Sequence, residues 1–266
     1  MSIDIRKLVK TGIGQFLTLS GLHRSKIDSK VIITAFHRVN DHLPPDSLTC
    51  RSEMFEQFCR YFKDNFRVVP LAEQIEGFKT GRNMGGTLSI TFDDGYLDNY
   101  EVAAPILEKL GLPATFFITS DFIASERVPF WDKELPQQPG WMNWEQVRDL
   151  AKRGFAIGGH TVNHIDMGKE PAERIRQELD TSKLRIESEL GRGIELFAYP
   201  FGGENNITET SRQLVREAGF NCCMSCHGGT NEPVTDVYRL KRIPISTWFS
   251  TPQQLTAELV MGSIRS

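Results

Sequence analysis

From residue 31 onward, short runs of β-branched and aromatic residues alternate with longer stretches of helical periodicity. Runs of this composition are typical of buried strands, and most of the stretches between them are long enough for helices. Strands that alternate with helices predict parallel pairing within an α/β fold. The eight predicted strands are VIITAF (31–36), FRVVP (66–70), TLSITF (87–92), ATFFIT (114–119), FAIGG (155–159), IELFAY (194–199), FNCCM (220–224) and YRLKRIPI (238–245).

Four helices between these runs have readable ends. Asn143 can cap a helix with Gln146 three residues later, and Gly154 can end it. A glycine follows each of the other three, and Pro171 suits the first turn of the longest. The predicted helices cover residues 99–110, 143–153, 171–190 and 208–218.

Eight strands in a chain of this length fit a (β/α) barrel, complete or incomplete, with a doubly wound open sheet as the alternative. The stretch 124–142, rich in Pro, Gln and Trp, predicts a long loop over one end of the sheet. Long loops in compact domains are often functional. Trp131, Trp141 and Trp144 could form a wall for a sugar ring, or they could anchor the loop in the core.

The first thirty residues have a different pattern. Their apolar positions recur at helical spacing with basic residues between them, so we expect an amphipathic helical segment over 1–30 ahead of the main domain over 31–266. The helix either packs on the domain or makes a peripheral membrane contact through residues 3–17. The apolar positions are Ile5, Leu8, Val9, Ile13, Phe16 and Leu17.

Composition narrows the class of protein. The 266 residues carry a net charge of −3, so no basic excess suggests a nucleic-acid partner. No apolar run is long enough to span a membrane, and the N-terminus lacks the unbroken apolar core of a secretory signal. Five cysteines, an odd number, fit a reducing compartment. We therefore expect a cytoplasmic location, with any membrane contact peripheral to the inner face.

Two adjacent carboxylates follow the predicted strand 87–92. Asp93 and Asp94 precede Gly95, which lets the backbone turn sharply. Neighbouring carboxylates repel each other unless a cation or a proton neutralises one of them. The pair therefore indicates either a charged site or, if exposed, a strand-to-helix turn in which Asp94 is a cap.

Two histidines follow the predicted strand 155–159. His160 and His164 are four residues apart, which on a helical turn places both on one face, where they can share a metal ion. His37 follows the strand 31–36, and Tyr199, Pro200 and Phe201 follow the strand 194–198. Because the carboxyl ends of parallel strands meet at one edge of the sheet, these groups are expected to converge there.

The motifs TFDDG (91–95), HTVNH (160–164) and YPFG (199–202), in this order, resemble the polysaccharide deacetylase family with the NodB homology domain. The resemblance covers about residues 31–245, and its first two motifs are the specific pair. It implies a distorted or incomplete (β/α) barrel and a divalent metal ion, commonly zinc, held by Asp94, His160 and His164. It also implies Asp93 as the general base and the backbone amide after Pro200 as an oxyanion donor.

Two features depart from that family's pattern. The place of an Arg that often orients the base, two residues before Pro200, is taken by Ala198, and Phe201 stands where a Tyr is usual. The late histidine that serves many members as general acid is missing, since His227 lies in a Gly-rich stretch and fits the motif poorly. His37 resembles the N-terminal histidine of another branch of the family. The alternative interpretation of His37 is a buried structural histidine.

The resemblance implies a metal-dependent hydrolase that removes N-acetyl groups from a polysaccharide or from an oligomeric or lipid-linked amino sugar. A role in carbohydrate metabolism, such as exopolysaccharide biosynthesis, follows from it. Two other functions remain open: a glycan-binding module that has lost catalysis, and a non-haem iron oxygenase, whose facial triad also uses two histidines and a carboxylate. The CxxCH sequence at 223–227 matches covalent haem attachment, but small buried thiols are the favoured interpretation.

Overall fold

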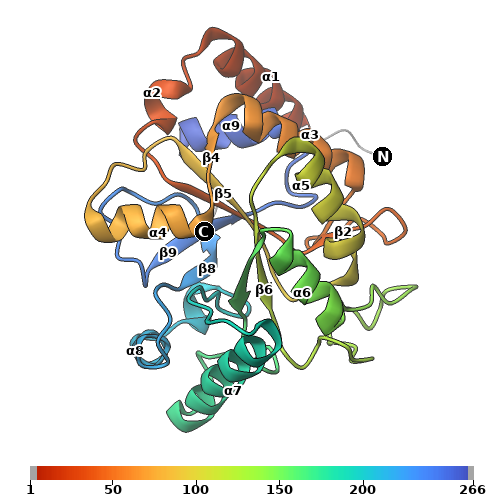
Figure 1. Cartoon of the computed structure of the whole chain (residues 1–266). Helices are drawn as coiled ribbons and strands as arrows, with labels where there is room; N and C mark the ends of the chain where they lie inside the picture. Colours follow the sequence, from red (N-terminus) through yellow and green to blue (C-terminus); the bar gives the residue numbers. More distant parts are fainter. Residues whose placement is uncertain (1–4, 263–266) are drawn as a thin grey trace.

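The computed structural model describes residues 5–262 and shows a parallel α/β barrel with helices around its strands (Figure 1). A seven-stranded sheet has the order β7-β6-β5-β1-β9-β8, with β4 paired to the start of β5. Phe197 then pairs with β7 and Ala198 pairs with β8, which closes the sheet upon itself. The predicted (β/α) barrel is confirmed, and its closing segment is irregular.

The elements alternate along the chain as the hydrophobic pattern predicts. The barrel strands are β1 (Ile32–Phe36), β4 (Arg67–Val68), β5 (Thr87–Phe92), β6 (Thr115–Ile118), β7 (Ala156–Gly159), β8 (Met224–Gly228) and β9 (Leu240–Pro244). A separate parallel pair is β2 (Arg38–Val39) with β3 (Thr49–Cys50). The helices are α1 (Ile5–Ser20), α2 (Arg24–Ile27), α3 (Ser52–Asn65), α4 (Leu71–Thr80), η1 (Asn99–Ala103), α5 (Ala104–Leu110), α6 (Trp144–Lys152), α7 (Ala172–Leu190), η2 (Glu204–Asn206), α8 (Glu209–Glu217) and α9 (Pro252–Met261).

Most predicted boundaries agree with these elements. Asn143 and Gln146 form the expected reciprocal cap of α6, and β5 has the predicted ends. Two predicted strands were wrong. The run 194–199 forms only two isolated bridges, one from Phe197 to Gly159 of β7 and one from Ala198 to Met224 of β8. The run 220–224 contributes only its last residue, and β8 continues to Gly228.

A row of phenylalanines fixes the strand ends that carry the site. Phe36, Phe92 and Phe116 are register partners on β1, β5 and β6, and their rings stack at centroid distances of 5.5 and 4.8 Å. Phe55 of α3 packs edge-on against Phe36 at 5.0 Å. All four rings are fully buried. Because His37 and Asp93 directly follow the first two, this row holds both polar residues at one level of the barrel.

The barrel has a second, inner cluster of apolar side chains. Successive residues of β1 and β6 alternate between the outer and inner clusters, as expected for strands buried on both faces. The inner cluster includes Ile33, Phe117, Leu196, Met224 and Leu240. Within the described range, the chain has no helix long and apolar enough to cross a bilayer.

Candidate metal and catalytic site

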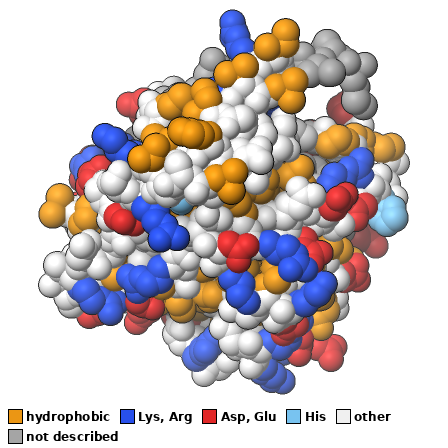
Figure 2. Space-filling view, turned by 90° about the horizontal axis from the view of Figure 1, so that it is seen from above, with side chains coloured by type: hydrophobic (Ala, Val, Ile, Leu, Met, Phe, Trp, Pro, Cys, Tyr) orange, Lys and Arg blue, Asp and Glu red, His pale blue; other side chains and the backbone are white. Residues whose placement is uncertain are grey.

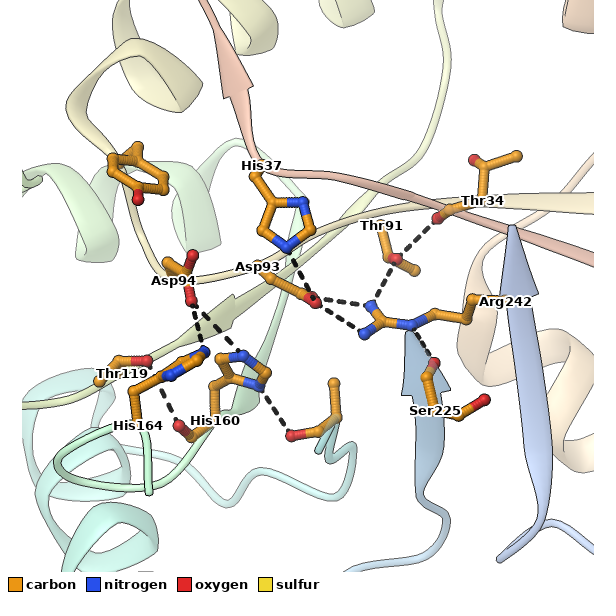
Figure 3. A network of polar contacts seen from close by, with 12 residues as sticks. Thr34, His37, Thr91, Asp93, Asp94, Thr119, His160, His164, Ser225 and Arg242 are labelled. Atoms are coloured by element: carbon orange, nitrogen blue, oxygen red, sulfur yellow. Dashed lines mark hydrogen bonds and ion pairs between the residues drawn. The ribbon is translucent and has the colours of Figure 1, made fainter. Parts of the chain in front are cut away.

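The predicted site residues meet at the carboxyl ends of the strands, around a cavity of about 270 Å³ (Figure 3). His37 follows β1, the two aspartates follow β5, and the two histidines follow β7. The site therefore lies at the edge of the sheet where parallel topology predicts it. The cavity is lined by His37, Ser47, Leu48, Asp93, Asp94, Phe130, Trp131, His160, His164, Phe201, Cys226, His227 and Pro244.

Asp94, His160 and His164 form a compact group of three ligand atoms, all within 4.8 Å of one another. Asp94 Oδ1 lies 3.5 Å from His160 Nε2 and 3.3 Å from His164 Nε2. Asp94 itself has a positive φ of 76°, a costly backbone conformation that aims its carboxylate at the histidines. The three side chains converge as the sequence predicted.

This group fits a divalent metal ion. Asp94 Oδ1 is buried and has no hydrogen-bond partner among residues 5–262, so a cation would satisfy it. Burial raises the pKa of Asp94 and lowers the pKa of both histidines, and the neutral imidazole is the form that binds metal. His160 Nδ1 lies 2.7 Å from the carbonyl oxygen of Ala198, which leaves Nε2 facing the aspartate. Two imidazoles and one carboxylate are a typical catalytic zinc set.

The histidine segment is a loop and not the helical turn that the spacing predicted. Thr161 and His164 have positive φ values of 64° and 55°, which no helix accommodates. The buried carboxylate of Glu178 on α7 holds the loop: it accepts hydrogen bonds from the backbone amides of Val162 and Asn163, each at 2.9 Å. The two histidines therefore converge through this tertiary contact, and nothing in the sequence marked Glu178.

Glu178→Gln is expected to weaken metal binding by about 10- to 100-fold, the usual effect of removing a group that orients a ligand. Both loop amides donate to Oε2, which the amide oxygen can replace, but Asn163 Nδ2 and Arg174 donate to Oε1, where the amide nitrogen would itself be a donor. Glu173→Gln, in the exposed first turn of the same helix, is the matched control. Zinc affinity measured by competition with a chromogenic chelator checks this. Equal affinity in both variants would contradict the role of Glu178.

Asp93 is held by an arginine that the sequence analysis did not identify. Arg242 on β9 donates two hydrogen bonds to it, from Nη1 to Oδ1 at 2.7 Å and from Nη2 to Oδ2 at 2.6 Å (Figure 3). Arg242 also donates to the hydroxyl of Thr91 and to the carbonyl of Ser225. Burial raises the pKa of Asp93, but the charge and hydrogen bonds of Arg242 outweigh it and lower the pKa overall. The carboxylate is therefore kept ionised.

Arg242 resolves one of the two departures from the family pattern. Asp93 does not lack an arginine: the arginine comes from β9 instead of from the position of Ala198. The signal that could have found it is strand alternation, because Leu240 and Arg242 share the inward face of β9. A charged side chain at an inward strand position needs a buried partner.

His37 lies beside the same carboxylate. Its Nε2 atom is 4.0 Å from Asp93 Oδ2, and the ring lines the cavity. Burial lowers the pKa of His37 to about 4, although Asp93 opposes the shift. The imidazole is therefore neutral at rest. The loop that carries it is tied to η1, since Asn99 Nδ2 donates to the His37 carbonyl oxygen at 2.6 Å.

The third predicted motif is only partly in the cavity. Phe201 lines it, with a positive φ of 60° and its ring 4.7 Å from that of His164. The Tyr199 side chain points instead into the outer core, where its hydroxyl contacts Cys223 Sγ at 3.1 Å. Pro200 is buried and outside the lining. The structure thus brings Phe201 to the site and leaves the Tyr199 side chain away from it.

The long loop contributes one tryptophan to the cavity. Trp131 lies 4.7 Å from His164 and donates a hydrogen bond from Nε1 to the hydroxyl of Tyr96. Tyr96 in turn bonds to Asp132, which pairs with the buried Arg38. Trp131 lines the cavity together with Phe130 and Phe201, so only one of the three tryptophans lies where a wall could form. The other two, Trp141 and Trp144, are not part of the lining: Trp141 stacks on Tyr96 and Trp144 begins α6.

The cysteines are all free and buried, including the two of the CxxCH segment, Cys223 and Cys226, and the neighbouring Cys222. Burial raises the pKa of the Cys222, Cys223 and Cys226 thiols to about 12, so they stay protonated. This confirms the interpretation of these residues as small buried side chains.

This chain is similar to several known proteins. The family model described as polysaccharide deacetylase matches residues 80–223. The peptidoglycan-N-acetylmuramic acid deacetylase PdaA of Bacillus subtilis is 25% identical over 70% of this chain, which spans 59% of that relative. The poly-beta-1,6-N-acetyl-D-glucosamine N-deacetylase of Escherichia coli K12 is 27% identical over 74% of this chain, which spans 34% of it.

A solved structure shares the fold. The Streptococcus pyogenes deacetylase PplD, in complex with acetate, superposes with a TM-score of 0.74. The match covers 89% of this chain and 99% of that one, at 20% sequence identity. At this identity the likeness concerns the fold, which is the distorted barrel described above.

Proposed function

This chain belongs to the polysaccharide deacetylase family, and on that premise we propose that it is a metal-dependent hydrolase that removes N-acetyl groups from an amino-sugar glycan. The observation that carries the proposal is the pairing of Asp93 with Arg242 beside the group of Asp94, His160 and His164. A carboxylate that is ionised before the reaction and lies next to a metal-binding triad is an arrangement that can activate water for attack on an amide. The two relatives named above, which act on N-acetylated sugars, support this substrate class.

Each polar group has a role in this proposal. Asp94, His160 and His164 would hold a divalent cation, which when bound would supply a Lewis acid for the water and the acyl oxygen. Asp93 accepts the proton of the attacking water, and Arg242 keeps its acceptor oxygens aimed at the cavity. Zinc is the metal that best suits this ligand set.

The leaving amine needs a proton, and His37 is the group placed to deliver it. Its neutral imidazole must first take up a proton, and the Asp93 carboxylate, which releases protons readily, lies 4.0 Å away. The proton removed from water by Asp93 thus passes to His37 and then to the departing amine. The Phe201 amide and the aromatic wall with Trp131 are proposed to hold the oxyanion and the sugar ring.

The rival functions are less well supported. A glycan-binding module without catalysis was suggested by Ala198 and by the missing late histidine, but Arg242 and His37 both lie beside Asp93. An iron oxygenase was suggested by the facial triad alone, and that function leaves the pairing of Asp93 with Arg242 without a role.

Acetate release from a panel of N-acetylated glycans tests the proposal. Zinc-loaded wild-type protein is expected to release acetate from at least one of them, and chelator followed by dialysis is expected to abolish release until zinc is restored. His160→Ala should lose both the metal and the activity, because it removes a ligand with a fixed orientation. Binding of a glycan without acetate release would favour the binding module, and oxygen consumption would favour the oxygenase.

A further inference from the structure

Helix α1 packs on the domain through its polar face, and its apolar face points outward. Its inward face contacts α9 and the segment before it. Lys7 Nζ donates to the Thr247 carbonyl oxygen and Lys10 Nζ pairs with Glu258, both at 2.9 Å. Gly14 is the only buried residue of the helix. The expectation that an amphipathic helix packs through its apolar face is therefore not met here.

This docking is specific. A Cβ atom at Gly14 would lie 1.8 Å from the Gln253 carbonyl oxygen, so the two backbones are in direct contact. Thr11 and Thr18 extend the same face by hydrogen bonds to Thr251 and Tyr61 at 3.0 and 2.7 Å. Polar bonds along several turns fix the rotation of the helix, and the exposure of its other face follows from them.

The outward face forms an apolar strip on the surface. Phe16 is 63% exposed and Leu8 is 58% exposed, and no neighbour covers them within the described structure. Figure 2, which looks down on this end of the molecule, shows hydrophobic side chains gathered in a band with Lys and Arg near it. We call this band the α1 strip, and its residues are Ile5, Leu8, Val9, Ile13, Phe16, Leu19 and Leu22.

The segment that carries the α1 strip has a net charge opposite in sign to that of the whole chain. Residues 1–30 contain six Lys or Arg and two Asp, a net charge of +4, whereas the complete chain carries −3. Arg24 and Lys26 are exposed on α2, directly after the strip. Trp248 follows the residue that Lys7 contacts and is 52% exposed. An apolar strip with cations and a tryptophan at its margins has the composition of an interfacial helix.

We propose that the α1 strip docks this protein on an anionic lipid bilayer. The helix would lie in the plane of the interface, with its apolar side chains among the acyl chains and the exposed cations Arg24 and Lys26 of α2 at the headgroups. Charge favours an anionic bilayer over a second copy of the chain as the partner of this strip. The exposed cations Arg24 and Lys26 next to it would attract anionic headgroups, whereas they would repel the same cations of a second copy. The proposal is independent of the catalytic activity.

Co-sedimentation with vesicles tests this surface. Full-length protein is expected to pellet with phosphatidylglycerol vesicles, to bind phosphatidylcholine vesicles far more weakly, and to be released from the anionic vesicles by salt. Leu8→Ser with Phe16→Ser is expected to lower the partition coefficient by about tenfold or more, because two large apolar side chains no longer enter the membrane. Both side chains face outward, so the fold should remain intact by circular dichroism.

A matched control is available away from α1. Leu184 on α7, which Figure 1 shows at the opposite end from α1, and Val234, in the connection between β8 and β9, are apolar residues at least as exposed as Leu8 and Phe16. Leu184→Ser with Val234→Ser should bind vesicles as the wild type does. If the wild type stays in the supernatant with anionic vesicles, or if both double variants lose binding equally, the proposal is wrong. A dimer that only the α1 variant dissociates, without vesicle binding, would also overturn it.

Discussion

Asp93→Asn is expected to reduce the turnover of deacetylation by about 10²- to 10⁴-fold, the contribution of a positioned general base. The amide cannot accept the proton of the attacking water, while its shape is almost that of the carboxylate. Asp94, His160 and His164 are unchanged, so zinc should still bind with a stoichiometry near one. Turnover of N-acetylated glycan and metal content by mass spectrometry measure the two effects separately.

Asp121→Asn is a suitable control for this substitution, because Asp121 is exposed and outside the cavity. The Asp93 substitution also leaves the buried Arg242 without a charged partner, so thermal unfolding must be recorded in parallel. Activity of folded, zinc-loaded Asp93→Asn at the wild-type rate would exclude Asp93 as the base.

Arg242→Met is expected to destabilise the fold by about 3–5 kcal/mol, because it leaves a buried carboxylate unpaired. The double variant Arg242→Met with Asp93→Asn removes both charges and should be more stable than Arg242→Met alone. Thermal or urea unfolding of the two single variants and the double variant gives the coupling energy directly. Additive effects of the two substitutions would contradict a specific interaction between these side chains.

The same substitution should change the pH dependence of turnover. With Arg242 present, the pKa of Asp93 is below its usual range, so this carboxylate stays ionised at acidic pH. Without that charge, burial alone acts and the pKa rises, so activity should be lost at a higher pH as the solution is acidified. Arg242→Lys keeps the charge without the paired geometry and should restore part of the acid tolerance. An unchanged acidic limb in Arg242→Met would contradict this role.

The sequence predicted the barrel because its signals are local. Each strand is a short apolar run, and most helices end at a cap or a glycine that acts within a few residues. The triad and the base were predictable for a similar reason: Asp93 and Asp94 are neighbours, and His160 and His164 are four residues apart. Parallel topology then requires that strand ends share an edge.

Pairings between distant segments were not predictable in this way. Asp93 and Arg242 are 149 residues apart, and Glu178 reaches back to a loop that contains a predicted helical turn. A lone arginine in a strand or a lone glutamate in a helix has the same local pattern whether it is solvated or buried. Only the closed barrel shows which side chains face each other.

The sequence by itself therefore predicted the fold class and the strand ends at which Asp93, Asp94, His160 and His164 lie, while their proposed roles come from the family resemblance. Tertiary structure decided that Arg242 orients Asp93, that Glu178 shapes the histidine loop and that Tyr199 faces the core. It also decided that α1 turns its apolar face outward, because Gly14 and the polar residues of the helix match α9. Periodicity identifies the two faces of a helix, but only the partner surface selects which one is buried.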